Sequence, residues 1–469
     1  MSAAQPLHSA GATPGPSLDE RDAALAAALA HARTFLGSLP QRPVVAPAAQ
    51  VDAIPDGIGV DAALAHFATR YAPSLSASPG PRYFGFVTGG STPAALAGDW
   101  LAAAYDQNVS HEQGSVAAAI ERETARTLAR WFGLDPAHDG VFVSGATTSN
   151  LVALATARQW AYARLGHDVA EAGLRDAPPI PVLAGAPHAS IGKALAVLGL
   201  GRRTLEHLAT LPGRTALDPA ALERRLAALD GAPAIVVASA GEVNTGDFDD
   251  LVTIAAMTRR YGAWLHVDGA FGLFAALVPA LADRVTGVAA ADSVTVDLHK
   301  WLNVPYDAAF VYTREPAATR AVFRASAPYL SLANDPLHAT PENSRRFRAL
   351  PAWTSIAAYG RDGVAAMVAR GVAQARRLGA AVAASPAFEL LDEVRLNIVC
   401  FALRDGDAAA RDALLAKLAA DGRVFMTPTV AFGRPAIRAA FSNWSTSDRD
   451  VEIALAALVH ALPYRALLA

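Results

Sequence analysis

Cysteine and lysine are both scarce in this 469-residue chain, and neither one sign of charge nor a long apolar run dominates it. The single cysteine, Cys400, excludes a disulfide framework within the chain, and its apolar surroundings (LNIVCFAL) predict a small core residue. The 43 acidic and 40 basic side chains leave a formal net charge of −3, so we expect no partnership with nucleic acid or an anionic membrane. The longest strongly apolar stretch, Phe271 to Ala282, is too short to cross a bilayer, and no signal-like segment opens the chain. These absences favour a cytoplasmic protein.

Only Lys193, Lys300 and Lys417 are lysines, and the other 37 basic side chains are arginines. A GC-rich genome explains such a bias without any function. Any chemistry that needs an amine side chain nevertheless has only three candidates. Lys417 lies at an expected exposed position of the helical pattern RDALLAKLAADGR, whereas Lys300 follows an apolar strand within DLHKWLN. Lys300 is therefore the first candidate, and Lys193 is its only rival.

Short apolar runs alternate with helical patterns from Val141 onwards. This alternation predicts an α/β fold with a mostly parallel sheet and helices on both faces. The predicted strands are 141–143, 180–183, 234–238, 264–267, 293–296 and 308–312, and the predicted helices between them are 149–165, 191–198, 219–229 and 250–261.

The two ends of the chain have other patterns. Helices are predicted over 18–39 and 60–71, and a helical pattern over 94–132 is interrupted by DQNVSHEQGS. A long helix is predicted from Trp353 to about 384, followed by a strand-like run at 396–403 and helices at 407–420 and 447–461. We expect an N-terminal helical segment (1–80), a large domain (81–353), and a linking helix with a small α+β domain (354–469).

The stretch GVFVSGATTSN reads as a strand, a turn of small residues and the start of a helix. Backbone N–H groups and hydroxyls at Gly145 to Thr148 would form an anion site that suits a phosphate. The alternative is an ordinary turn in which Ser149 or Asn150 caps the helix.

Two further polar residues follow predicted strands. Asp268 ends the strand of AWLHVDGAFG, where α/β sheets bind ligands at their carboxyl edge, although it could equally cap the next helix. His188 opens a helix in APHASIGKAL, and its ring could stack on a flat cofactor or serve only as a cap. Together with the phosphate site and Lys300, these residues describe what pyridoxal 5'-phosphate (PLP) needs, namely a phosphate cradle, an acid for its ring nitrogen and an amine for a Schiff base.

In this order the chain resembles the group II PLP-dependent amino-acid decarboxylases, the family of aromatic-L-amino-acid and glutamate decarboxylases. The resemblance covers residues 81 to about 353 and is carried by PRYFGFV, DQNVS…GSVAAAIERE, SGATTSNLVALATAR, PHASIGKAL, AGEVNTGDFDDL, LHVDGAFG, DLHKWLNVPYDAAFVYTR and RRFRALPAW. It implies a fold type I PLP-dependent transferase fold and a homodimer whose active site lies at the subunit interface.

The resemblance also implies roles for the matched positions. Lys300 would form the Schiff base, Asp268 would pair with the pyridinium nitrogen, and His188 would stack on the ring opposite Ala270. The remaining implied residues bind the phosphate or flank the lysine (Gly145, Ala146, Thr147, Asp297 and His299) or line the substrate pocket (Phe86, Val87, Thr88 and His111). No metal is expected. Arginine could not replace Lys300, because a permanently protonated side chain cannot form the imine.

The chain departs from its relatives at two places. The loop before RRF, SLANDPLHATPENSRRF, lacks the tyrosine that delivers the Cα proton in animal and plant members, and Tyr329 lies too far upstream to match. His338 is the nearby side chain that could act as this acid, or it is an ordinary loop histidine. Polar His111 and Glu112 stand where relatives usually have apolar residues, which indicates either a polar or cationic substrate or a rearranged dimer contact.

Three functions follow from this pattern. The first is decarboxylation of an L-amino acid to its amine. The second is decarboxylation with oxidative deamination (an aldehyde synthase) or another carbon–carbon lyase reaction, because loss of the loop tyrosine favours aldehyde formation. The third is a degenerate relative used for binding or assembly, which the presence of Lys300 and Asp268 disfavours.

Overall fold

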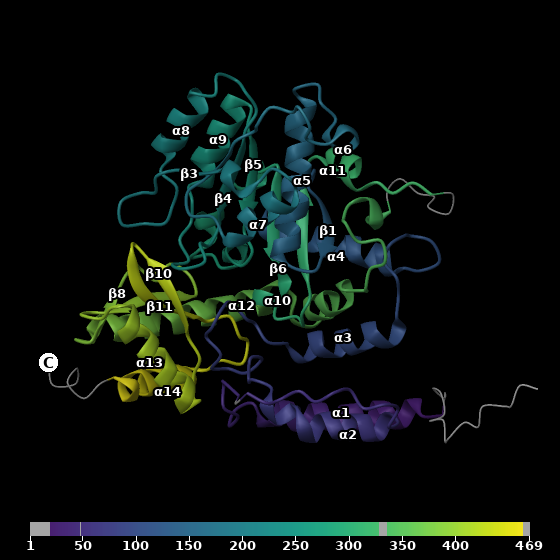
Figure 1. Cartoon of the computed structure of the whole chain (residues 1–469), viewed down its shortest axis with the longest axis vertical. Coiled ribbons are helices and arrows are strands. Elements are labelled where there is room, and N and C mark those ends of the chain that lie inside the picture. The colour runs from purple at the N-terminus through teal and green to yellow at the C-terminus, as the bar shows by residue number, and fades with distance from the viewer. Residues whose placement is uncertain (1–18, 47, 328–334, 463–469) are drawn as a thin grey trace, which may run out of the picture.

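A seven-stranded sheet lies at the centre of the structure, a computed structural model that describes residues 19–46, 48–327 and 335–462 (Figure 1). The strand order is β1-β7-β6-β5-β4-β2-β3, in which β3, β2, β4, β5 and β6 are parallel and β7 is antiparallel to β6 and β1. The strands are Asp139–Val143 (β1), Val182–Ala184 (β2), Leu205–His207 (β3), Ile235–Ser239 (β4), Trp264–Asp268 (β5), Ser293–Asp297 (β6) and Ala309–Thr313 (β7). The predicted mostly parallel α/β sheet is confirmed.

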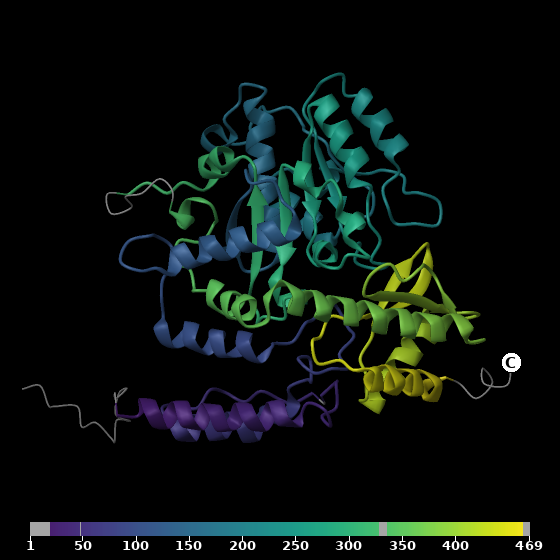
Figure 2. The same cartoon turned by 180° about the vertical axis from the view of Figure 1, so that it is seen from behind.

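Helices cover both faces of this sheet, as predicted. α5 and α7 pack together on the face turned to the viewer in Figure 1, and α4 lies on the face seen in Figure 2. The helices up to β7 are Arg21–Ser38 (α1), Val60–Arg70 (α2), Pro93–Tyr105 (α3), Ala117–Phe132 (α4), Ala146–Ala163 (α5), Val169–Ala172 (α6), Ala189–Val197 (α7), Pro219–Ala227 (α8), Leu251–Tyr261 (α9) and Leu298–Trp301 (α10). The predicted helices at 149–165, 191–198, 219–229 and 250–261 correspond to α5, α7, α8 and α9.

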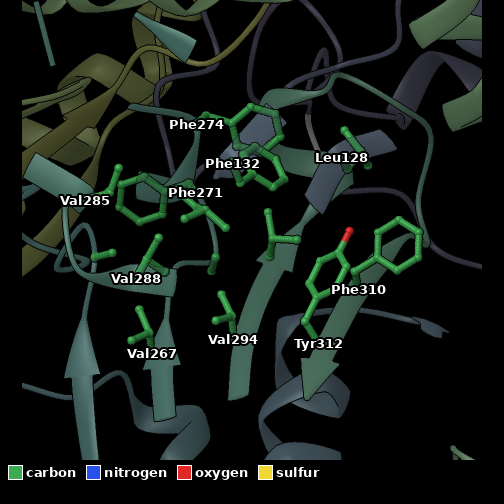
Figure 3. Packing of buried hydrophobic residues seen from close by; sticks show 14 of the residues in the cluster. Leu128, Phe132, Val267, Phe271, Phe274, Val285, Val288, Val294, Phe310 and Tyr312 are labelled. Carbon is green, nitrogen blue, oxygen red and sulfur yellow. The ribbon is translucent and has the colours of Figure 1, made fainter. Parts of the chain in front are cut away.

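The main core fills the space between the sheet and α4. Every residue of β5, β6 and β7 is buried. Burial on both faces explains why β5 and β7 are mostly apolar in the sequence, whereas β6 alternates valines with polar residues. Figure 3 shows their side chains gathered with Phe132 of α4 and Phe274, whose ring centroids lie 5.2 Å apart in an edge-on arrangement. Tyr312 of β7 donates its hydroxyl hydrogen bond to the carbonyl oxygen of Ala125 (2.9 Å). The apolar packing holds the carboxyl ends of the strands at fixed positions.

A second, antiparallel sheet with the order β10-β11-β9-β8 forms the C-terminal part. Its strands are Phe388–Leu390 (β8), Ile398–Leu403 (β9), Thr427–Ala431 (β10) and Arg434–Ala440 (β11), and the helices that accompany it are Ala349–Ala384 (α12), Ala408–Asp421 (α13) and Asp448–Ala461 (α14). The remaining helix, Pro316–Phe323 (α11), packs against α5 beside the central sheet. The predicted α+β character is therefore present. The long helix α12 differs from the expectation, because it begins before Trp353 and is interrupted at Gly360, whose φ of 62° favours glycine.

The N-terminal helices α1 and α2 lie side by side below α3, away from the central sheet (Figures 1 and 2). Both were predicted from helical spacing, yet neither contains a fully buried residue. Among the described residues, no helix is both long and apolar enough to cross a membrane, and no group of three or more histidine, cysteine, aspartate or glutamate side chains could hold a metal ion.

Candidate active site

The carboxyl ends of β4, β5 and β6 open onto a cavity of about 260 Å³. Parallel strands place the residues at their ends along one edge, so Ser239, Asp268 and Asp297 come together although the sequence separates them. The cavity is lined by Phe86, Val87, Ala146, Ala186, His188, Ser239, Gly241, Glu242, Val243, Asp268, Ala270, Phe271, His299, Lys300, Tyr306 and Arg438.

Lys300 enters this cavity from α10, the short helix that follows β6. Its Nζ lies 2.8 Å from Asp297 Oδ2, and the Nε2 of His299 lies 3.5 Å from the same oxygen. The other oxygen of Asp297 accepts a hydrogen bond from the backbone N–H of Ala146 (2.9 Å). Asp297 therefore links the lysine to the first residue of α5.

The predicted phosphate cradle lies at the start of α5. The first N–H groups of a helix have no carbonyl partner within it, so this end attracts an anion. A Cβ atom built on Gly145 would lie only 3.4 Å from His299 Cε1, so a side chain there would fill the space between the turn and the lysine segment. The hydroxyls of Ser144 and Thr148 lie 2.9 Å apart, and Thr147 is exposed.

Asp268 is 8% exposed at the end of β5. Its Oδ2 accepts a hydrogen bond from Asn150 Nδ2 (2.9 Å), and its Oδ1 accepts one from the backbone N–H of Ala270 (3.2 Å). These two donors fix the orientation of the carboxyl group at the edge of the cavity. This geometry suits the role that the sequence predicts for Asp268.

His188 caps α7, and its ring lines the same cavity. Its Nδ1 accepts a hydrogen bond from the backbone N–H of Ser190 (3.2 Å), and the Ser190 hydroxyl lies 2.8 Å from the same nitrogen. Burial lowers the pKa of His188, which favours the neutral ring. A neutral, fixed imidazole suits stacking on a flat cofactor. His188 can therefore cap α7 and stack on a cofactor at the same time.

The other sequence-predicted residues divide into two groups. Phe86, Val87 and Ala270 line the cavity, and Thr88 is buried beside them with its hydroxyl donating to the carbonyl oxygen of Gly85 (3.2 Å). The structure does not bring His111 and His338 to the cavity wall that this chain forms.

His111 is exposed, and His338 is buried in a short helix where its Nδ1 accepts from the backbone N–H of Ala325 (3.2 Å). The loops that carry the two histidines touch, because the Leu337 N–H donates to the Ser110 carbonyl oxygen (3.2 Å). The role of each histidine stays a prediction, and Tyr329 lies outside the described residues.

Sequence reasoning missed four polar residues of the cavity (Ser239, Glu242, Tyr306 and Arg438), of which Arg438 on β11 is the most informative. It is 5% exposed, its Nε donates to the carbonyl oxygen of Val243 (2.6 Å), and its buried Nη2 has no hydrogen-bond partner among the residues that the structure describes. Burial lowers the pKa of Arg438 to about 10, so it is still a cation at neutral pH. An unpaired buried guanidinium nitrogen is costly, and the nearby carboxyl of Glu242 offsets part of that cost through its charge.

Glu242 and Tyr306 are two of the other missed residues. The carboxyl oxygens of Glu242 accept hydrogen bonds from Asn244 and Thr245 at 2.9–3.2 Å, and burial raises the pKa of this carboxyl. The ring of Tyr306 lies 4.5 Å from that of His299, centroid to centroid. The only sequence signal for Arg438 is a charged residue inside the apolar alternation of RPAIRAA.

These residues fit PLP. Lys300 can hold its aldehyde, Asp268 its ring nitrogen, His188 a ring face and the start of α5 its phosphate, and all four border one cavity. The fit rests on the donor set and on the space that a side chain at position 145 would fill.

Comparisons with known proteins agree with this site. An aromatic-L-amino-acid decarboxylase of Bacillus atrophaeus is 28% identical over 345 residues, which are 71% of this chain and 70% of that protein. The crystal structure of Oryza sativa TDC with PLP and tryptamine has a TM-score of 0.89 at 23% identity and covers 96% of this chain and 98% of that one. A 4-hydroxyphenylacetaldehyde synthase of Rhodiola rosea has a TM-score of 0.84 at 22% identity, over 95% and 98% of the two chains.

The fold of these neighbours confirms the predicted fold type I architecture. The family model described as the pyridoxal-dependent decarboxylase conserved domain matches residues 54–404. The chain therefore belongs to the pyridoxal-dependent decarboxylases, enzymes whose cofactor is PLP.

Proposed function

We propose that the protein decarboxylates an L-amino acid to the corresponding amine, with PLP held on Lys300. The observation that carries this proposal is that Lys300, Asp268 and the buried cation Arg438 border the same cavity. When bound, PLP supplies an electron-withdrawing ring that accepts the electrons of the Cα–carboxylate bond. The cofactor requires an amine and an acid, which Lys300 and Asp268 supply, and the carboxylate of an amino-acid substrate requires a cation, which Arg438 supplies.

Each residue has a separate task in this proposal. Asp268 keeps a proton on the ring nitrogen, and His188 covers one ring face. Asp297 orients the Lys300 amine, from which it lies 2.8 Å away. Arg438 binds the substrate carboxylate and so fixes the direction of the bond that breaks.

Protonation of Cα decides the product. Loss of CO2 leaves an electron pair at Cα, and a proton there gives the amine. The alternative is oxidative deamination to an aldehyde, which consumes oxygen and releases ammonia. It is favoured by the missing loop tyrosine and by the position of His338 away from the cavity wall of this chain. Measuring oxygen uptake and ammonia release during turnover separates the two outcomes.

We also propose a homodimer with the active site at the subunit interface. The supporting observation is that α1 and α2 contain no buried residue and leave Leu25 and Phe67 56% and 50% exposed. At the mouth of the cavity, Phe86 is also 62% exposed. Exposed apolar side chains of this kind favour contact with a second copy of the chain. Analytical ultracentrifugation should show twice the chain mass, and a monomer at all concentrations would contradict the proposal. A cytoplasmic location stays a prediction from the sequence.

The function is tested with Lys300→Ala and with Lys193→Ala, a matched change at an exposed lysine. Borohydride reduction makes the lysine–cofactor bond permanent, and peptide mapping should then find the cofactor on Lys300. Lys300→Ala should abolish CO2 release while the protein stays folded, and Lys193→Ala should behave as wild type. Screening the standard amino acids and diaminobutyrate for CO2, with products identified by mass, names the substrate. Turnover by Lys300→Ala, or a label on Lys193, would refute the proposal.

A further inference from the structure

Asn150, the fifth residue of α5, is fully buried and uses its whole hydrogen-bonding capacity. Its Nδ2 donates to Asp268 Oδ2 (2.9 Å) and to Ser190 Oγ (3.0 Å). Its Oδ1 accepts from Thr295 Oγ1 (2.7 Å) and lies 3.0 Å from His266 Nε2. One amide therefore joins α5, β5, β6 and the start of α7 directly behind the cavity.

The orientation of this amide is fixed by a chain of buried groups. Because Oδ1 can only accept, the proton of His266 must be on Nε2, and its Nδ1 then accepts from Ser293 Oγ (2.9 Å). Ser293 Oγ in turn accepts from Trp264 Nε1 (3.0 Å). Turning the amide over would place Oδ1 against a carboxylate oxygen of Asp268 and the NH2 group against His266 Nε2, so Asp268 and His266 together hold the amide in one orientation.

The hydrogen bond from Asn150 to Ser190 determines the tautomer of His188. Ser190 Oγ accepts from Asn150 Nδ2, which leaves the Ser190 hydroxyl proton for His188 Nδ1. That nitrogen already accepts from the Ser190 backbone N–H, so the proton of the neutral ring is on Nε2. The same amide thus orients both the acid and the histidine that border the cavity.

We infer that Asn150 is a positioning residue for the PLP site, and that His266 keeps it in place. Asn150 aims one oxygen of Asp268 and, through Ser190, fixes the tautomer of His188. This inference rests on the proposed roles of Asp268 and His188 toward PLP. It predicts that a change at Asn150 alters how PLP is held before any substrate is present.

The test is Asn150→Asp, a change of equal size that removes both amide donors and places a second carboxyl beside Asp268. The dissociation constant for PLP should rise roughly 10- to 100-fold, because a hydrogen bond to a charged group contributes about 1.5–3 kcal/mol and each 1.4 kcal/mol is tenfold. The absorption band of bound PLP should also become pH-dependent, since the ring nitrogen loses its fixed partner. Neither readout requires turnover.

Gln159→Glu is the matched control. Gln159 lies on the same helix, is 5% exposed, and its Nε2 donates to Asp168 Oδ1 (2.8 Å) while its Oε1 accepts from the Ala170 N–H (3.1 Å). It therefore makes the same exchange of amide for carboxyl beside an aspartate, far from the cavity. This variant should bind PLP as wild type does, even if its melting temperature falls.

His266 supplies the rescue experiment. His266→Leu removes the donor to Asn150 Oδ1 and should weaken PLP binding, whereas His266→Gln retains an N–H donor and should restore it. Melting temperatures of the cofactor-free variants measure any general loss of stability separately.

Asp268→Asn, measured in parallel, separates failure of this inference from failure of the proposed function. If Asp268→Asn weakens PLP binding while Asn150→Asp keeps the wild-type dissociation constant and band, the inference about Asn150 is overturned alone. If neither change affects PLP, the role of Asp268 fails as well, and this inference fails with it.

Discussion

Replacement of Arg438 by methionine should separate substrate binding from stability. Methionine has a similar length but no charge, so the variant removes a cation that is 5% exposed and has one unpaired nitrogen. A hydrogen bond to a charged group contributes about 1.5–3 kcal/mol, so kcat/KM should fall roughly 10- to 150-fold. The cofactor-free protein should be as stable as wild type or more stable, because replacing an incompletely paired buried charge by an apolar group is often neutral or favourable.

The decisive assay compares two ligands of each protein. The affinity for the substrate amino acid, which has a carboxylate, should fall in Arg438→Met, while the affinity for the product amine, which has none, should change less than about threefold. Arg438→Lys should lie between the two, because a lysine retains the charge but not the planar fork of donors. An equal loss for both ligands would show that Arg438 only shapes the cavity, and no loss for either would refute the carboxylate site.

Three further outcomes are expected. Arg345→Met should lower the free energy of unfolding by about 3–5 kcal/mol in urea titrations, because it leaves Glu121 as an unpaired buried charge. The two side chains are 2.7 Å apart and at most 3% exposed. Adding Glu121→Gln should recover much of the loss. Stability should fall by up to about 3 kcal/mol as the pH drops from 6.5 to 4, because burial lowers the pKa of His266 to about 4 and the unfolded chain then binds the extra proton; His266→Gln should lack this slope in calorimetry. Native Cys400 should resist thiol reagents until the protein unfolds, because burial raises the pKa of its thiol to about 12, and rapid labelling of folded protein would contradict its burial.

The sequence predicts the central sheet well where strands are buried on both faces. β4, β5 and β7 are such strands, and their apolar residues stand out between helical patterns. β6 is also buried, but its valines alternate with Ser293, Thr295 and Asp297. β3 has three residues, is only partly buried at the sheet edge, and therefore leaves no apolar run to find. β10 was missed for a related reason, since it is a half-exposed edge strand that contains Pro428.

Some residues of the candidate site can be predicted from the sequence and others cannot. Asp268, Asp297 and His188 each follow a strand, so the sheet alone brings them to one edge. Asn150 was considered only as a helix cap, and His266 lies in mid-strand among apolar residues, where nothing in the sequence shows that they meet. Such contacts depend on the strand order, which a list of elements does not contain.

Arg438 shows why substrate recognition is harder to predict from sequence than cofactor binding. The residues suited to PLP come from strand ends and helix starts within the large sheet, whereas Arg438 arrives from the other sheet, on β11. Arg438 donates a hydrogen bond to Val243, in the loop that follows β4. The carboxyl group of Glu242 in the same loop already accepts hydrogen bonds from Asn244 and Thr245. Glu242 also acts electrostatically on Arg438 from within the chain, and under the proposed function the substrate carboxylate is a second anion for this guanidinium. Substitutions at the meeting of the two sheets should consequently change substrate choice while leaving PLP binding intact.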